Sequence, residues 1–395
     1  MVTHLSLFPM HTFKSFLSEE VETKLKHIEH VEDHPVNDGP EGFHHAVSAL
    51  NKAHEHMKDK RHSSDLSMKY DGSPSLVYGH HPKTGKFFVA SKSAFNKNPK
   101  INHTEADIEK NHGHAPGLVD KLKHALKHLP KIAPKHGVYQ GDVLFSHGDV
   151  THHGNGKHSF TPNTITYTAK GKEGEKVAKA KLGLVTHTQY HGDSIENMKS
   201  HPHPDMSGFK HHEDVYHKTA EHDTSKVHYT PEKQKEFHSH IAAAQKIHNE
   251  HGHKMYEPLQ HNKEHVKTYI NHTVRTGEKP NPEGLKSHIR SKYEKELSKL
   301  KTDKSKTEKH SQLNSHMSHI DKNNEHYKNL FNLHHHLTKA KHTLVDTLNQ
   351  HHGGLEHHIA GTKSHPEGFV VHHDGKPSKL VDRQEFSKAN FLKTR

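Results

Sequence analysis

KYDGSPSLVYG, residues 69–79, is the stretch of sequence that decides the fold. Just before it, in DLSMKYDG, apolar residues alternate with polar ones, which predicts a strand with one packed face. The following SLVYGHHPKTGKFFVAS (75–91) is typical of a β-hairpin that turns at KTGK. Lys69 is therefore expected on the polar face at the end of a strand, with Gly72 allowing a tight turn beside it.

The rest of the chain alternates between helical and strand-like patterns and then changes character. From about residue 201 to 352 the strand patterns vanish and long polar segments show helical periodicity. Strands return at EGFVVHHDGKPSKLV. We therefore expect an α+β fold with antiparallel or mixed sheets, divided into an N-terminal extension (1–40), one domain built from 41–200 and 353–395, and an inserted all-helical domain (201–352).

The composition is very polar, with 29% hydrophobic residues and a mean hydropathy of -1.06, but the apolar residues gather in short strand-like runs that can form a core. The absence of cysteine excludes disulfides and thiolate metal sites. No run of about 18 apolar residues exists, so we expect no membrane span. The 57 Lys and Arg against 46 Asp and Glu give a net charge of +11. This charge fits either a polyanionic partner or a solvated basic surface.

Histidine is the most unusual feature of the composition, with 55 residues spread over all regions. One interpretation is a metal store or a pH switch, because histidine titrates near neutral pH. We favour the alternative that histidine replaces other polar surface residues, since the histidines follow no single spacing and a metal site needs a few fixed ligands. On either interpretation the chain becomes much more basic below about pH 6.

Five side chains in short segments are suited to chemistry on a nucleotide. The amine of Lys69 can attack the α-phosphorus of a nucleoside triphosphate once it is neutral. Lys92 and Lys379 can supply positive charge and bind phosphate oxygens. Asp142 and Glu367 provide the hard oxygen ligands that Mg²⁺ prefers.

Taken in order, these segments resemble the motifs of the covalent nucleotidyltransferases, which comprise DNA ligases, RNA ligases and mRNA capping enzymes. KYDGS resembles their KxDG motif, which implies that Lys69 is the nucleophile. LGLVTHTQY resembles the motif whose aromatic ring stacks on the base, a place that His187 takes here. YQGDVL and EGFVV resemble the motifs with metal-linked carboxylates. The resemblance implies nucleotide contacts from Asp71, Gly72, Lys92, His187, Lys379 and Arg383, and metal ligation by Asp142 and Glu367.

The sequence departs from the family pattern at two positions. Asp142 stands where the family usually has Glu, and Val381 stands where the motif resembled by SKLVDRQEF has a second lysine. Arg383 or Lys388 would have to replace that lysine. KYDGSPSLVYG, FTPNTITY and KLVDRQEFSKANF also resemble an uncharacterised family of tailed-phage proteins related to RNA ligases, over roughly 26–200 and 353–393.

The resemblance implies a ligase-type nucleotidyltransferase domain. Because too few residues follow Lys379 for a C-terminal OB-fold domain, an RNA-ligase-like enzyme is favoured over a capping enzyme. We expect an ATP-dependent polynucleotide ligase that forms lysyl-AMP on Lys69 and seals 5′-phosphate and 3′-hydroxyl ends, of RNA rather than DNA. Its metal would be Mg²⁺, with Mn²⁺ as an alternative, and it would act as a monomer. The alternative is a catalytically inactive ligase fold that binds nucleic acid or is an internal virion protein.

The N-terminal MHTFKSFLSEE resembles the capsid-targeting leader of internal proteins of T4-like phages. The resemblance implies cleavage after Glu19 and contact with a phage capsid or scaffold. An ordinary capping helix is the other interpretation. The expected location is the host cytoplasm during phage infection, or the virion if the leader acts.

Overall fold

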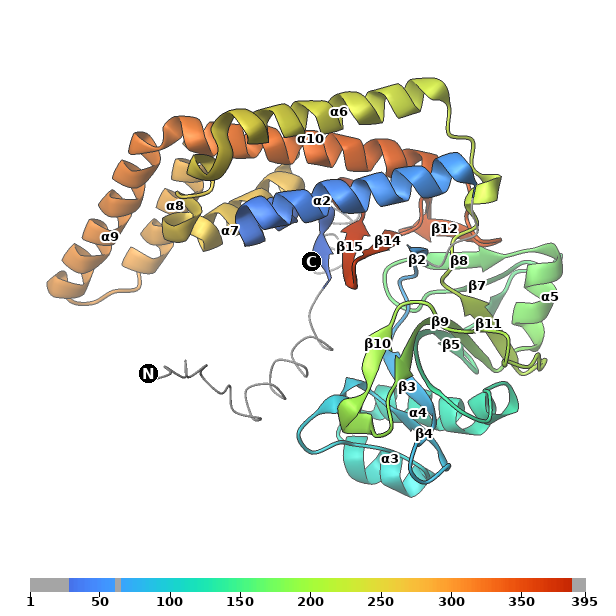
Figure 1. Cartoon of the computed structure of the whole chain (residues 1–395). Coiled ribbons are helices and arrows are strands. Elements are labelled where there is room, and N and C mark those ends of the chain that lie inside the picture. Colours follow the sequence, from blue (N-terminus) through green and yellow to red (C-terminus); the bar gives the residue numbers. More distant parts are fainter. Residues whose placement is uncertain (1–27, 61–64, 386–395) are drawn as a thin grey trace, which may run out of the picture. The chain divides into compact units, whose positions relative to one another are not determined.

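The computed structural model describes residues 28–60 and 65–385, so the predicted leader, its cleavage site and Lys388 lie outside the described residues. The structure is mixed α+β, as expected from the sequence (Figure 1). The chain divides into two compact units that both draw on separate segments. Unit 1 contains residues 71–163 and 170–219, and unit 2 contains residues 28–70, 164–169 and 220 onward.

Unit 1 is organised around a mixed sheet in which β10, β9, β5, β3 and β4 are neighbours in that order. β11 also pairs with β9, in parallel, from Val215 opposite Leu182. The predicted hairpin is confirmed, because β3 and β4 pair antiparallel. The strands of unit 1 are β3 Ser75–His80, β4 Phe87–Ala90, β5 Val138–Ser146, β6 Thr151–His152, β7 His158–Phe160, β9 Leu182–His191, β10 Lys199–His201 and β11 Val215–Thr219.

Apolar side chains of this sheet point to both of its faces, where they form two clusters. On one face Leu76 and Tyr78 pack with Leu122 of a helix, and on the other Val77 packs with Phe88. The helices of unit 1 are α3 Glu105–His112, α4 Pro116–His128 and α5 Gly171–Lys179, with 3-10 turns at Lys92–Phe95, Leu129–Lys131 and Ile195–Asn197. The sheet of unit 1 is therefore buried on both faces around its centre.

Unit 2 contains a four-stranded sheet with the order β1, β15, β14, β2. β14 pairs antiparallel with both β2 and β15, which places Gly368 opposite Lys69 and Val370 opposite Lys379. Three further strands form the order β13, β12, β8. The strands of unit 2 are β1 Glu29–His30, β2 Leu66–Lys69, β8 Thr166–Ala169, β12 Glu356–Ile359, β13 Thr362–Ser364, β14 Gly368–His373 and β15 Lys376–Leu380.

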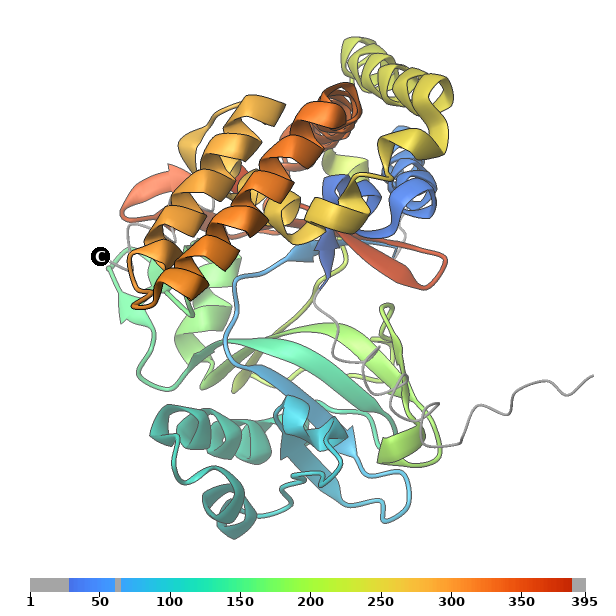
Figure 2. The same ribbon diagram turned by 90° about the vertical axis from the view of Figure 1, so that its left-hand side faces the viewer.

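Long helices make up most of unit 2, and α10 runs alongside α6 (Figures 1 and 2). The helical periodicity predicted for this part of the chain is confirmed in the last of these helices, because Leu330, Leu337 and Leu344 of α10 are all buried. The helices are α2 His34–Asp59, α6 Pro231–His251, α7 Leu259–Thr276, α8 Pro282–Leu297, α9 Asp303–Lys322 and α10 Asn324–Leu348, with 3-10 turns at Val31–Asp33, Thr224–Lys226 and Gly252–Met255. Within the described residues, no helix has the length and hydropathy of a membrane span.

Two segments lie in other surroundings than their sequence patterns suggested. Residues 28–40, which we assigned to an extension, belong to unit 2: β1 joins its sheet, and α2 begins at His34 and kinks at Gly39, which has a φ of +61°. Between residues 201 and 352, where we expected only helices, β11 pairs with β9 in unit 1. The long helices begin only at Pro231.

Candidate functional site

Lys69 and Glu367 lie side by side at the ends of neighbouring strands in unit 2. Lys69 is the last residue of β2, and Glu367 precedes Gly368, which is directly opposite Lys69. Lys69 Nζ donates a hydrogen bond to Glu367 Oε1 at 2.5 Å, although the two residues are 298 positions apart in the sequence. Both side chains are only partly covered, with 30% of Lys69 and 18% of Glu367 exposed. This pair is therefore accessible to a ligand.

Lys379 belongs to the same face of this sheet. Its neighbour Ser378 points toward α2, where its Oγ is 2.8 Å from His34 Nε2. Because side chains alternate along a strand, Lys379 points to the opposite face. Lys69 pairs with Gly368 of β14, and Lys379 pairs with Val370 of the same strand. Because residues two apart on a strand share a face, Lys69 points to the same side of the sheet as Lys379. Burial lowers the pKa of Lys379, and the positive charge of Lys69 lowers it further, while Glu367 opposes the shift. The three side chains thus interact electrostatically.

Val381 occupies the place where the resembled motif has a second lysine. A Cβ on Gly368 would lie 2.6 Å from Val381 Cγ2, and Gly368 has a φ of +149°. Glycine is therefore required next to Glu367, because any side chain there would meet both β15 and an unfavourable backbone conformation. Val381 is 5% exposed and fills this space with an apolar group.

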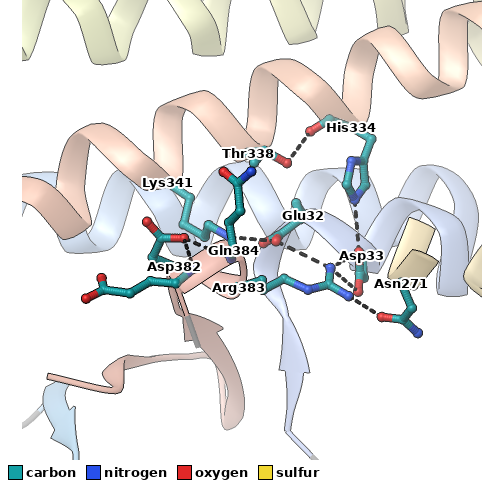
Figure 3. Close-up of polar contacts among 10 residues, drawn as sticks. Glu32, Asp33, Asn271, His334, Thr338, Lys341, Asp382, Arg383 and Gln384 are labelled. Atoms are coloured by element: carbon teal, nitrogen blue, oxygen red, sulfur yellow. Dashed lines mark hydrogen bonds and ion pairs between the residues drawn. The ribbon is translucent and has the colours of Figure 1, made fainter. Parts of the chain in front are cut away.

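Arg383, the predicted substitute for that lysine, is part of a buried ion-pair network in unit 2 (Figure 3). Its guanidinium donates two hydrogen bonds to the carboxylate of Asp33, at 2.9 and 3.0 Å, and a third to the side chain of Asn271. Next to it, Lys341 Nζ donates to Glu32 Oε1 at 2.6 Å. Arg383 is 8% exposed. Its contacts in the structure are thus structural, and a role in nucleotide binding stays a prediction.

The remaining predicted residues lie in unit 1. Asp71 accepts a hydrogen bond from Asn163 Nδ2 at 2.8 Å. Gly72 lies against β5, because a Cβ at this position would be 2.6 Å from Asp142 Cβ. Asp142 Oδ1 is in turn 3.5 Å from His187 Nε2. The structure therefore brings Asp71, Gly72, Asp142 and His187 into one neighbourhood of contacts around the middle of β5 and the middle of β9.

Lys92 also belongs to unit 1, where it opens a 3-10 turn after β4 and is exposed. The predicted site residues thus form two sets, one in each unit. The sets are joined covalently, because Lys69 and Asp71 are separated only by Tyr70. The KYDGS segment therefore crosses from unit 2 to unit 1 between residues 70 and 71.

Asn163 is a site residue that the sequence analysis missed. It lies in FTPNTITY, one of the segments that resemble the phage protein family. That resemblance drew attention to the segment, but nothing in the sequence predicted the contact between Asn163 and Asp71. Asparagine after a Pro is also common in turns, which gave it an ordinary structural explanation.

The carboxylates at the site suit Mg²⁺ by their chemistry. Within the described residues, no group of three or more His, Asp or Glu side chains is arranged to hold a metal. Mg²⁺ usually binds through one or two carboxylates together with water and substrate phosphates. The partly exposed carboxylate of Glu367 in unit 2 and that of Asp142 in unit 1 fit such a role.

A model of the family of unknown function DUF6267 matches residues 25–395. None of the curated proteins and none of the solved structures compared with the chain matches it. The family match covers Lys69 on β2, Glu367 just before β14, and Lys379 on β15.

Proposed function

Since this chain belongs to DUF6267, a family of unknown function, we propose its activity from the chemistry of its own residues: ATP-dependent nucleotidyl transfer through Lys69, followed by ligase-type joining of polynucleotide ends. The observation that carries the proposal is the 2.5 Å contact between Lys69 Nζ and Glu367 Oε1. Two short segments, which resemble nucleotidyltransferase motifs and lie far apart in the sequence, meet in one place. The fold around them would be of the ligase type.

In the first step, the neutral amine of Lys69 attacks the α-phosphorus of ATP. A P–N bond forms, the bond from the α-phosphorus to the bridging oxygen breaks, and pyrophosphate leaves. Glu367 Oε1, which already accepts a hydrogen bond from Nζ, is placed to take the proton of the amine. The ammonium of Lys379 would bind phosphate oxygens and stabilise the charge that develops on them.

In the second step, a 5′-phosphate attacks the phosphorus of lysyl-AMP, the P–N bond breaks, and a 5′–5′ pyrophosphate linkage forms. In the third step, a 3′-hydroxyl attacks the phosphorus of the 5′-phosphate. A phosphodiester bond forms, the pyrophosphate linkage breaks and AMP leaves. Bound Mg²⁺ would neutralise charge on the phosphates, and the carboxylates of Glu367 in unit 2 and of Asp142 in unit 1 are each proposed as metal ligands. Asp71 and His187 would contact the nucleoside, and RNA ends are the favoured substrate.

The first step is tested by incubating the full chain with α-labelled ATP and Mg²⁺ and measuring label that survives denaturation. Lys69→Ala should abolish the label, and Lys69→Arg should abolish it as well, because the guanidinium of arginine stays protonated near neutral pH and offers no free electron pair for attack on phosphorus. Lack of covalent label from any nucleoside triphosphate or from NAD would overturn the proposal.

The contribution of Lys379 is tested with a matched lysine on the same strand. Lys379→Ala should reduce the labelling rate by about a hundredfold, the usual effect of removing one group that stabilises developing charge. Lys376, also on β15, is exposed and forms an ion pair with Asp38. Lys376→Ala should leave the labelling rate unchanged. Equal labelling rates for the two variants would show that Lys379 does not contribute to nucleotide transfer.

Val381 favours a second candidate, a ligase fold that binds nucleotides without transferring them. A valine cannot bind phosphate, so the site has one cation fewer than the resembled motif. This candidate predicts that ATP protects the protein against heat while no covalent label forms. A role as an internal virion protein belongs with this candidate.

A further inference from the structure

The end of the hairpin formed by α8 and α9 contributes nothing to the hydrophobic core. The two helices run side by side in unit 2 and are joined by a short loop (Figures 1 and 2). From Glu294 to Gln312 no residue is buried. Tyr293 and Leu313, on either side of this segment, are the nearest buried residues. Packing therefore does not explain the sequence of the segment, which we call the hairpin tip.

The hairpin tip and the adjoining turn of α8 carry an excess of uncompensated positive charge. Six exposed lysines lie between residues 292 and 306, and a seventh lysine is Lys309, against four carboxylates in residues 292–312: Glu294, Glu296, Asp303 and Glu308. Within the described parts of the chain, none of the six lies in an ion pair, whereas Lys286 and Lys309 on either side pair with Asp321 and Glu296. The six are Lys292, Lys295, Lys299, Lys301, Lys304 and Lys306.

Such an arrangement is costly without a partner, because like charges repel and only solvent and salt screen them. Lys304 lies in the first turn of α9, where the helix dipole already adds positive potential. The local electrostatics therefore favour binding of a polyanion at the tip.

We infer that the hairpin tip binds the phosphate backbone of the nucleic acid whose ends the enzyme joins; the choice of partner rests on the proposed function. Lysine contacts phosphates as a point charge and lacks the fork with which arginine reads bases. The tip carries no Phe, Tyr or Trp that would insert into a membrane or stack on bases. Binding at the tip is thus independent of base sequence and sensitive to salt.

The inference is tested by measuring the affinity of the full chain for a 5′-phosphorylated single-stranded RNA at several salt concentrations, without ATP or Mg²⁺. In one variant Lys299, Lys301, Lys304 and Lys306 are all changed to Gln. It should bind more weakly, and the slope of log affinity against log salt should shrink by about 3, because each lost phosphate contact on a single strand removes about 0.7.

A matched control changes four exposed lysines elsewhere in unit 2 to Gln: Lys58, Lys235, Lys254 and Lys363. It has the same net charge and should keep the wild-type slope. Equal loss of binding in both variants, no loss in the tip variant, or binding to anionic lipid vesicles instead of RNA would each overturn the inference. If the tip variant loses RNA binding while the wild type shows no label on Lys69, the proposed function fails and this inference stands.

Discussion

Gly72 is a residue whose substitution tests how the KYDGS segment is packed. Its Cα lies so close to β5 that a Cβ would be 2.6 Å from Asp142 Cβ and 3.0 Å from the carbonyl oxygen of Val143. Gly72→Ala should lower the free energy of unfolding by about 1–3 kcal/mol, the usual cost of overpacking. Urea denaturation would measure it. Gly117→Ala is the control, since no atom lies within 4 Å of its Cβ position; an equal loss there would contradict the steric explanation.

The buried pair of Glu32 and Lys341 is the other feature that single residues can test. Their side chains are 1% and 0% exposed. Burial would raise the pKa of Glu32, but the ammonium of Lys341, with His30 and Arg383, holds it below the ordinary value. Lys341→Met should therefore destabilise the chain by about 3–5 kcal/mol, because it leaves a buried carboxylate without its main partner.

The double variant Glu32→Leu/Lys341→Met should recover most of that loss, since it removes both charges. Thermal unfolding of the single and double variants would compare them. If the double variant is as unstable as Lys341→Met, the destabilisation comes from lost packing and not from an unpaired charge.

These residues also show what the sequence analysis could predict at this scale. Lys69 and Glu367 stand in recognisable motifs, and the structure brings them together. Glu32, Lys341 and Arg383 were not recognised as a buried network, because charged residues in a polar sequence are normally expected at the surface. Only their partners, which come from distant segments, make their burial tolerable.

Among the elements, α7 and α9 are joined by a network of histidines. Asn262 of α7 is buried, and its Oδ1 accepts a hydrogen bond from His316 Nδ1 at 2.7 Å. His316 Nε2 is 2.9 Å from the hydroxyl of Tyr293 on α8, so it accepts when the ring is neutral. The ring of His265 lies 4.7 Å from that of His316. The geometry therefore fits a neutral His316 that donates from Nδ1 and accepts at Nε2.

Burial lowers the pKa of His265 to about 4, with His316 and Lys292 adding to the effect and Glu296 opposing it. Burial also lowers the pKa of His316. The unfolded chain thus binds more protons below about pH 6.5, so this stability is complete above that pH and is lost as the pH falls toward the folded values.

We predict that His265→Gln makes the free energy of unfolding less dependent on pH between 6.5 and 4. The slope of the free energy of unfolding against pH should fall by less than about 1.4 kcal/mol per pH unit, which is the limit for one proton. The fall stays below this limit because the His265 side chain is partly exposed. Urea denaturation at a series of pH values measures the slope. His310→Gln, an exposed site on α9, should leave the slope unchanged; the same change in both variants would contradict the assignment to the network.

At the same scale, elements with strong periodicity were predictable and short polar ones were not. The hairpin of β3 and β4 and the helical conformation of α10 followed from their patterns. β10 and β11 are short, and their sequences, KSH and VYHKT, carry too few apolar residues to mark a strand. Their strand conformation depends on pairing with β9.

At the scale of the whole molecule, the chain passes repeatedly between the two units, yet unit 1 is nearly continuous. Only residues 164–169 interrupt it, and both of its apolar clusters draw all their members from residues 76–215. We predict that a fragment of residues 71–219 folds on its own, with a cooperative thermal transition and dispersed amide resonances. It should not become labelled by ATP, because it lacks Lys69.

A fragment without a cooperative transition would show that unit 1 depends on unit 2 for its stability. The division of the chain into a nucleotidyltransferase domain (41–200 and 353–395) and a helical insertion (201–352) stays a prediction. Sequence patterns could not define the compact units, because β1, α2 and β8 join unit 2 through contacts with segments far away in the chain.

The most direct test of the central claim is to locate the nucleotide on the protein. The full chain is incubated with ATP and Mg²⁺, digested, and mapped by mass spectrometry. The account predicts a single modified peptide that contains KYDGS, with AMP on the side-chain nitrogen of Lys69 and no modification of Lys379 or Lys92. AMP on another residue, or an unmodified Lys69 under conditions in which ATP is bound, would contradict it.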